Sequence, residues 1–238
     1  MVCDILRYDR AVPTFAHDRI FDVSAVAEAR KNTRRRVSWP AIFMKAYALN
    51  AQRFPRLRQT WMSWPRSHLY DHHEHVGTLV VHRRFENDDW LFWGNVRNPA
   101  AKSIVEIQQE IDRFQTAPVE TVFAQQLWLA RQGTLRRRLV WWVLFHLSGA
   151  KKARRLGTFF ITTISGKGAE VQDPPSILTS ALTYGPMDQA GKTRVTISYD
   201  HRLLDGHHIA DILVGLEQTM QRELLAELQQ YGQTRSAA

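Results

Sequence analysis

Three long segments of the chain carry apolar residues at helical spacing. The first follows Ser38, has Pro40 in its first turn and ends before Pro55. The second opens with residues 103–106, a Ser-x-x-Glu capping box, and continues with isoleucine and phenylalanine at helical intervals. The third runs from about Gly206 to Tyr231 with one apolar stripe. These patterns predict helices that each bury one face.

Shorter segments rich in β-branched and aromatic residues predict strands between the helices. Two of them flank the polar residues 87–89, which predicts a hairpin. A fourth helix is expected from Asp22 or Ser24, either of which can cap it, into residues 34–36. Because helices and strands are intermixed, the predicted class is α/β or α+β. The predicted strands span residues 19–23, 76–81, 90–93, 158–164, 177–184 and 193–199.

The last of these strands has a clear two-residue period. Val195, Ile197 and Tyr199 are expected on one face, and Thr196, Ser198 and Asp200 on the other.

Composition favours a folded domain in a reducing compartment. Of 238 residues, 44% are hydrophobic and 23% charged, which excludes general disorder. Neither a repeat nor a flexible linker divides the chain, so we expect residues 1–238 to form a single domain. The one cysteine, Cys3, excludes a disulfide scaffold and a cysteine-based zinc cluster. The first residues do not resemble a signal peptide, so we expect a cytoplasmic protein.

The net charge of +9 widens the range of partners without selecting one. Such a charge attracts nucleic acid, anionic lipid, acidic proteins or phosphorylated cofactors. No nucleic-acid recognition motif accompanies it, so nucleic-acid binding is not expected. His72, His73 and His75 suggest a metal site, but no cysteine or acidic cluster completes a ligand set, so no metal is expected.

The segment with the clearest chemistry is residues 198–206, where a strand ends in polar residues and a helix begins. A histidine held at such a junction, His201, suits a general base, because neutral imidazole is basic near working pH. Asp205 can fix the loop, and Gly206 can accept a backbone conformation closed to other residues. The alternative interpretation is a surface histidine followed by a helix-capping aspartate, and spacing alone does not decide between them.

Residues 201–206 closely resemble the His-Arg-x-x-Asp-Gly motif of the acyltransferase (E2) catalytic domain of 2-oxo acid dehydrogenase complexes, a family that also resembles chloramphenicol acetyltransferase. Residues 157–164 and 174–185 resemble the family's preceding strands in the same order and spacing. Weaker similarity covers most of the remaining chain except residues 118–156. The resemblance implies a two-layer α/β sandwich with a mixed sheet, assembly as a homotrimer, and active sites where adjacent subunits meet.

The family's mechanism assigns roles to particular residues. The resemblance implies that His201 removes a proton from the acceptor, which then attacks an acyl thioester. It also implies that Thr162 donates a hydrogen bond to the oxyanion, at a position where the family usually has serine. Threonine keeps the hydroxyl but adds a methyl group, and the alternative is an ordinary buried strand residue.

Four further residues in or beside the motif are expected to shape its loop. Asp205 stands where chloramphenicol acetyltransferases have a carboxylate paired with an arginine near the amino terminus, and the candidates here are Arg7 and Arg10. Arg202 is expected either to anchor the loop or to contact an anionic donor. Asp200 and Gly206 are included as loop-shaping residues.

Two departures from the family bear on function. No lipoyl or subunit-binding domain is expected in residues 1–238. The expected acyl donor is therefore a coenzyme A thioester, an acyl carrier protein thioester or a lipoyl domain on another chain. No bound cofactor is expected. We expect a free-standing acyltransferase in specialised-metabolite or lipid biosynthesis, with a catalytically silent trimeric scaffold as the alternative. The second departure is residues 136–155, an apolar run between basic clusters that is too short to span a bilayer. A packed helix is favoured over a membrane-surface helix there.

Overall fold

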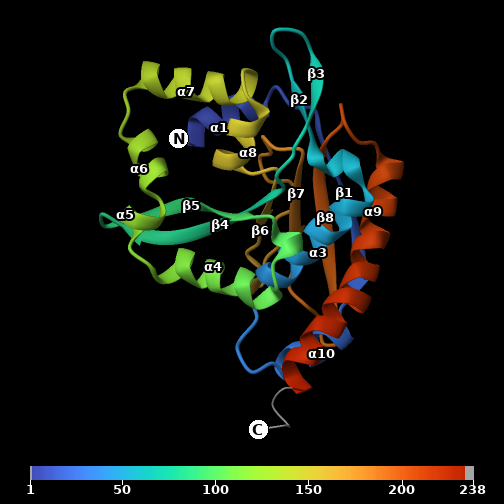
Figure 1. Cartoon of the computed structure of the whole chain (residues 1–238). Helices are drawn as coiled ribbons and strands as arrows, with labels where there is room; N and C mark the ends of the chain where they lie inside the picture. Colours follow the sequence, from blue (N-terminus) through green and yellow to red (C-terminus); the bar gives the residue numbers. More distant parts are fainter. Residues whose placement is uncertain (1, 234–238) are drawn as a thin grey trace.

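The computed structural model describes residues 2–233 as a mixed sheet with helices on both faces (Figure 1). The strands are β1 (Thr14–Asp22), β2 (Gln59–Met62), β3 (His68–Asp71), β4 (Val76–Phe85), β5 (Asp88–Arg97), β6 (Phe159–Thr162), β7 (Ser180–Tyr184) and β8 (Lys192–Asp200). The helices are α1 (Val2–Asp9), α2 (Ser24–Lys31), α3 (Trp39–Arg53), α4 (Ile104–Thr116), α5 (Val119–Val122), α6 (Ala124–Ala130), α7 (Thr134–His146), α8 (Gly149–Leu156), α9 (Gly206–Thr219) and α10 (Leu225–Gln233).

The main sheet has six strands in the order β1-β8-β7-β6-β4-β5, and β2 and β3 form a separate ribbon. Strand β6 is parallel to both β4 and β7, whereas the other neighbouring pairs are antiparallel. This mixed sheet with flanking helices confirms the predicted fold class, and α1, α7 and α8 add a helical layer on the second face of the sheet.

Each face of the sheet is buried against a different group of helices. Helices α3, α4 and α9 pack on one face, where Val195, Ile197 and Tyr199 of β8 join the larger apolar core. The other face carries a smaller core that includes Trp141 of α7 and Phe160 of β6. The alternation predicted for residues 193–199 is therefore confirmed, because successive side chains of β8 enter opposite layers.

Local signals in the sequence correspond to the observed element ends. Ser103 accepts a hydrogen bond from the backbone N–H of Glu106, and Glu106 accepts one from that of Ser103, which confirms the capping box. The hairpin turns at Glu86 and Asn87, both with positive φ, one residue before the predicted position. The predicted C-terminal helix is continuous from α9 to α10 through a wider π-helical turn at Met220–Leu224.

Other segments differ from expectation. Helix α2 ends at Lys31, and β6 ends at Thr162, so both are shorter than predicted. Helix α1, which no sequence pattern predicted, precedes β1 and contacts the smaller core through Ile5 and Tyr8. In residues 136–155 the predicted packed helix is present as α7, which buries Trp141. None of the helices described in residues 2–233 combines the length and the apolar character that crossing a bilayer demands.

Candidate functional site

His201 directly follows β8, on a turn between β8 and α9. Its backbone N–H donates to the carbonyl of Pro13 at 2.9 Å, which ties the turn to the start of β1. The imidazole meets the edge of Phe15, with ring centroids 4.8 Å apart, and lies 5.9 Å from the ring of Tyr199. The side chain is exposed, and neither ring nitrogen has a hydrogen-bond partner within residues 2–233. Both nitrogens are therefore open to a ligand.

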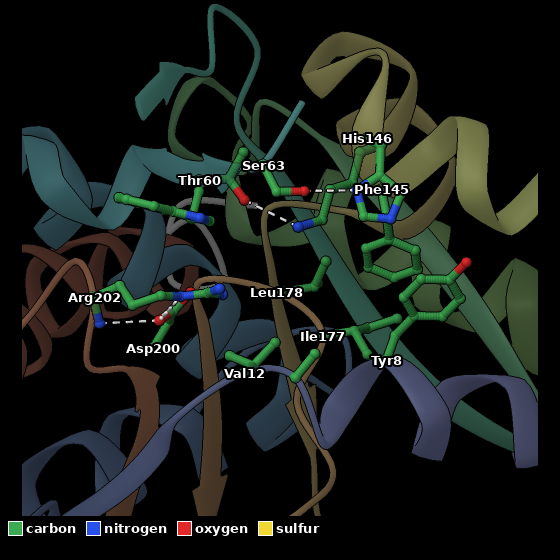
Figure 2. Close-up of a pocket in the computed structure, with 13 residues that line it drawn as sticks. Tyr8, Val12, Thr60, Ser63, Phe145, His146, Ile177, Leu178, Asp200 and Arg202 are labelled. Carbon is green, nitrogen blue, oxygen red and sulfur yellow. Dashed lines mark hydrogen bonds and ion pairs between the residues drawn. The ribbon is translucent and has the colours of Figure 1, made fainter. Parts of the chain in front are cut away.

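An ion pair inside the turn holds its shape. The buried carboxylate of Asp200 accepts from Nε and Nη2 of Arg202 at 2.9 and 2.7 Å, and from the Arg202 backbone N–H at 3.0 Å (Figure 2). The guanidinium also lies over Trp61, 5.6 Å from the ring centroid. Of the two roles expected for Arg202, the structure shows the loop-anchoring contact.

Asp205 is the N-cap of α9 and so fixes where the loop ends and the helix begins. Its carboxylate accepts from the backbone N–H of His208 at 2.9 Å and pairs with Nδ1 of the same residue at 2.7 Å. These hydrogen bonds hold the pKa of the Asp205 carboxyl below its usual range. Neither Arg7 nor Arg10 pairs with it in the part of the chain that the structure describes.

Gly206 acts differently from the sequence-based expectation. It is the first residue of α9, and its φ is not positive, so an unusual backbone conformation does not explain the glycine. A Cβ at this position would lie 3.1 Å from Nε2 of His17, closer than ordinary contact. Any larger residue at this position would require the ring of His17 to shift by a few tenths of an ångström.

Thr162 is the last residue of β6 and lies on the sheet face that carries α7 and α8. It lines an apolar cavity of about 610 Å³ whose walls include Trp90, Trp93 and Phe160. Within residues 2–233 its hydroxyl makes no side-chain hydrogen bond, whereas the adjacent Thr163 donates to the carbonyl of Tyr184 at 2.9 Å. Of the two neighbouring threonines, Thr162 has the hydroxyl that is free for a ligand.

Gly157, two residues before β6, allows the chain to approach β4 closely. Gly157 has a φ of +97°, and a Cβ there would lie 2.0 Å from Oγ1 of Thr78. That hydroxyl donates to the carbonyl of Leu156 at 2.8 Å, which fixes the chain as it enters β6. Only glycine combines this conformation with this close contact.

His201 and Thr162 do not meet within one chain. Thr162 pairs with Thr183 of β7, which pairs with Thr196 of β8, so two strand spacings and five residues separate Thr162 from His201. Standard sheet dimensions put their Cα atoms roughly 19 Å apart. The His201 ring also contacts Tyr199, which faces the opposite layer from Thr162. A single chain therefore cannot bring both groups to one carbonyl.

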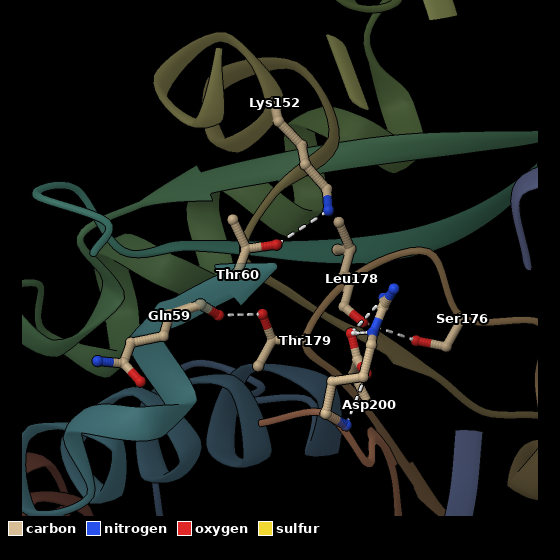
Figure 3. Close-up of polar contacts among 8 residues, drawn as sticks. Gln59, Thr60, Lys152, Ser176, Leu178, Thr179 and Asp200 are labelled. Carbon is tan, nitrogen blue, oxygen red and sulfur yellow. Dashed lines mark hydrogen bonds and ion pairs between the residues drawn. The ribbon is translucent and has the colours of Figure 1, made fainter. Parts of the chain in front are cut away.

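Sequence reasoning missed Lys152, which it treated as part of a basic flank. The residue is only 6% exposed, and its Nζ donates to Oγ1 of Thr60 at 3.0 Å (Figure 3). Burial lowers the pKa of Lys152 to about 8, partly offset by the charge of Asp200. The structure buries Lys152 and exposes its neighbour Lys151. The alternation of basic and apolar residues along α8 is the sequence signal that could have indicated a buried face there.

Replacing Lys152 by methionine is expected to stabilise the protein by about 3 kcal/mol at pH 7. The pKa of Lys152 falls from an ordinary 10.5 to about 8 on folding. At about 1.4 kcal/mol per pKa unit, this shift means that folding disfavours the charged lysine by about 3 kcal/mol. Below pH 8 both states carry the charge and the whole cost is present. Between pH 8 and 10.5 only the unfolded state is protonated, so the advantage of Lys152→Met shrinks and then vanishes. Denaturant unfolding across this pH range measures it.

The exposed neighbour supplies the control for this experiment. Lys151→Met removes the same charge from the same helix without changing a buried group, so its effect is expected within about 0.5 kcal/mol of zero. A Lys152→Met protein that is no more stable than wild type at pH 7 contradicts the cost assigned to the buried ammonium.

Similarity to known proteins is confined to solved structures. No family model and no curated protein matches the chain. The chain is similar to the cubic core of a pyruvate dehydrogenase multienzyme complex, with 15% identity over 95% of this chain and 88% of the other, and a TM-score of 0.67. A dihydrolipoamide acetyltransferase from Azotobacter vinelandii is 14% identical over 95% and 88%, with a TM-score of 0.65.

A chloramphenicol acetyltransferase is also similar, at 15% identity over 91% of this chain and 94% of its own, with a TM-score of 0.53. In all three cases the match extends over nearly the whole of both chains. The chain thus has the fold shared by the acyltransferase catalytic cores of 2-oxoacid dehydrogenase complexes and by chloramphenicol acetyltransferase.

Proposed function

We propose that this protein is a free-standing acyltransferase that moves an acyl group from a thioester to a hydroxyl, amine or thiol. His201 takes the proton of the acceptor as that atom attacks the thioester carbonyl. The carbonyl oxygen becomes negative and receives a hydrogen bond from Thr162. When the tetrahedral intermediate collapses, the carbon–sulfur bond breaks and the leaving thiolate takes the proton from His201. The proposed reaction uses no metal and no redox cofactor.

The observation that carries the proposal is the position of the two groups on this fold. An imidazole with unoccupied nitrogens follows β8, and a free hydroxyl ends β6 beside an apolar cavity. The similar Azotobacter vinelandii enzyme was investigated for the roles of a serine, a histidine and an asparagine in its catalytic mechanism, with the asparagine four positions after the histidine. Asp205 stands four positions after His201, and we assign it the positioning of the turn through its cap on α9.

The separation of the two groups supports a site shared between copies of the chain. His201 of one copy would act with Thr162 of the next, which a cyclic trimer permits because each interface is the same. Strand β1 lies at the edge of the sheet, beside His201, and leaves Phe15 and Ile20 about half exposed. These side chains are available to contact a neighbouring copy.

The donor and the location belong to the same proposal. A net charge of +9 suits donors with phosphate groups or acidic surfaces, namely coenzyme A thioesters and acyl carrier proteins. A separate lipoyl domain is the third donor of the same chemistry. We place the single catalytic domain in the cytoplasm, in lipid or specialised-metabolite biosynthesis, where the apolar cavity beside Thr162 would receive an apolar acyl chain or acceptor.

The experiment that tests the proposal follows thiol release. The protein is incubated with short and long acyl-coenzyme A thioesters, acyl carrier protein thioesters and acylated lipoyl domain, each with mixed hydroxyl, amine and thiol acceptors, and a thiol reagent reports the product. Protein-dependent release that also requires an acceptor supports acyl transfer. Release from none of the three donor types, by protein that is folded and assembled, contradicts it.

Replacing Thr162 by valine is expected to lower turnover by about 100- to 1,000-fold, since one oxyanion donor is typically worth about 3 kcal/mol. Valine keeps the shape of the side chain and removes only the hydroxyl. Thr162→Ser restores that hydroxyl and is expected to stay within about tenfold of wild type. Turnover of Thr162→Val equal to that of wild type, measured by the same thiol release, would remove Thr162 from the mechanism.

A further inference from the structure

A second cavity, lined by both charged and apolar side chains, lies at the end of the sheet next to the His201 turn. It has a volume of about 150 Å³ and is open to solvent on one side. Residues of α1, β2, the α7–α8 segment and the end of β8 line it (Figure 2). A cavity of this volume accommodates benzene, so it has room for about six non-hydrogen atoms. It shares the side chains of Ile177 and Leu178 with the larger apolar cavity, but Thr162 does not line it.

The cavity contains a buried ammonium group that the protein satisfies only in part. Lys152 extends from α8 so that its Nζ donates to Oγ1 of Thr60 (Figure 3). The same Nζ lies 5.2 Å from the ring centroid of Phe145. An ammonium has three N–H donors, and one hydrogen bond uses one of them. No carboxylate forms an ion pair with Lys152 anywhere in residues 2–233, and the carboxylate of Asp200 in the same wall is engaged by Arg202.

The charges around the cavity leave one positive charge uncompensated. Arg202 and Asp200 neutralise each other, while Lys152 has no partner of opposite charge. His146 pairs with Ser63 at 2.7 Å, and burial lowers the pKa of that imidazole, so it is neutral at pH 7. Burial also raises the pKa of Tyr8, which is therefore a neutral phenol. A ligand with a single negative charge matches this balance better than a phosphate dianion does.

The rest of the wall is apolar. The side chains of Val12, Phe145, Ile177 and Leu178 line the cavity (Figure 2). A ligand that fills the space therefore has one anionic end against Nζ and a short hydrocarbon part against these side chains. A carboxylate with three or four carbons meets both conditions and the volume.

We propose that this cavity is a binding site for a small monocarboxylate with a short apolar tail, whose carboxylate accepts hydrogen bonds from Nζ of Lys152. The site is distinct from the proposed acyl-transfer site, because neither His201 nor Thr162 lines it. Its ligand also contacts the Asp200–Arg202 pair that shapes the turn bearing His201. The inference concerns binding without turnover, so it stands or fails separately from acyl transfer.

Isothermal titration calorimetry with butyrate tests the proposal on the full chain, in a buffer without phosphate or carboxylate. Butyrate has six non-hydrogen atoms, and butyramide is its neutral counterpart of the same shape. We expect butyrate to bind with a Kd of about 1 mM or tighter, within the range for a ligand of this size, and butyramide and inorganic phosphate to bind at least tenfold more weakly. No binding of butyrate at 20 mM, or equal binding of butyramide, overturns the proposal, and so does tighter binding of phosphate.

Two variants locate the binding site. Lys152→Met is expected to weaken butyrate binding at least tenfold, and the matched Lys151→Met, on the exposed side of α8, is expected to leave it unchanged. Circular dichroism and thermal unfolding establish that both variants are folded, and butyrate should raise the Tm of wild type and Lys151→Met only. Butyrate binding by a folded Lys152→Met protein with wild-type affinity places the ligand elsewhere and overturns the proposal.

Discussion

Replacing His201 by alanine is expected to lower turnover by about 100- to 10,000-fold, the range typical for loss of a general acid–base group. Histidine is the most frequent general base in enzymes, and the nitrogens of this imidazole make no hydrogen bond within residues 2–233 that would be lost. The backbone N–H of residue 201, which holds the turn to Pro13, is kept in the variant. The loss is therefore expected in kcat, while thermal stability changes little.

A second histidine at the same end of the molecule provides the control. His207 lies in the first turn of α9, is highly exposed and is only 3.8 Å from the carboxylate of Asp211. His207→Ala is expected to keep wild-type turnover. A folded His201→Ala protein that also keeps it would exclude His201 as the base and favour the scaffold hypothesis, in which the fold organises partner enzymes without catalysis.

The parts of this fold that sequence predicts are those encoded by neighbouring residues. The capping box at Ser103 and the proline in the first turn of α3 mark their helix starts, because both act within one turn. The alternation along β8 predicts which side chains enter which layer, because the two-residue period of a strand is local. Helix α1 has only eight residues, which is too short for a periodic pattern of apolar residues to predict it.

The parts that sequence leaves open depend on long-range placement. Lys151 and Lys152 are identical in type and adjacent, yet one is exposed and the other buried, because α8 packs its second lysine against β2 and α7. The roughly 19 Å between Thr162 and His201 follows from strand order and register, which no local pattern encodes. The family resemblance implied active sites between subunits, and the strand register adds how far apart one chain keeps Thr162 and His201.

That separation leads to an experiment on mixed assemblies. His201→Ala keeps a functional Thr162, and Thr162→Val keeps a functional His201, so each variant alone has only defective sites. If a site takes His201 from one copy and Thr162 from the next, a mixed assembly contains interfaces where both residues are native. Each interface has a fixed direction, so one of the four equally frequent neighbour combinations is functional in a random equal mixture.

Co-expression of the two variants with different affinity tags is therefore expected to restore about one quarter of wild-type turnover per chain, against about 1% or less for either variant alone. Co-expression of two differently tagged copies of His201→Ala should restore nothing, which controls for effects of mixing itself. A site built from a single chain predicts no gain in any mixture, because no copy then holds both groups. Activity of the mixed protein equal to the average of the two separate variants would thus contradict the shared site, even if each single substitution had abolished turnover as expected.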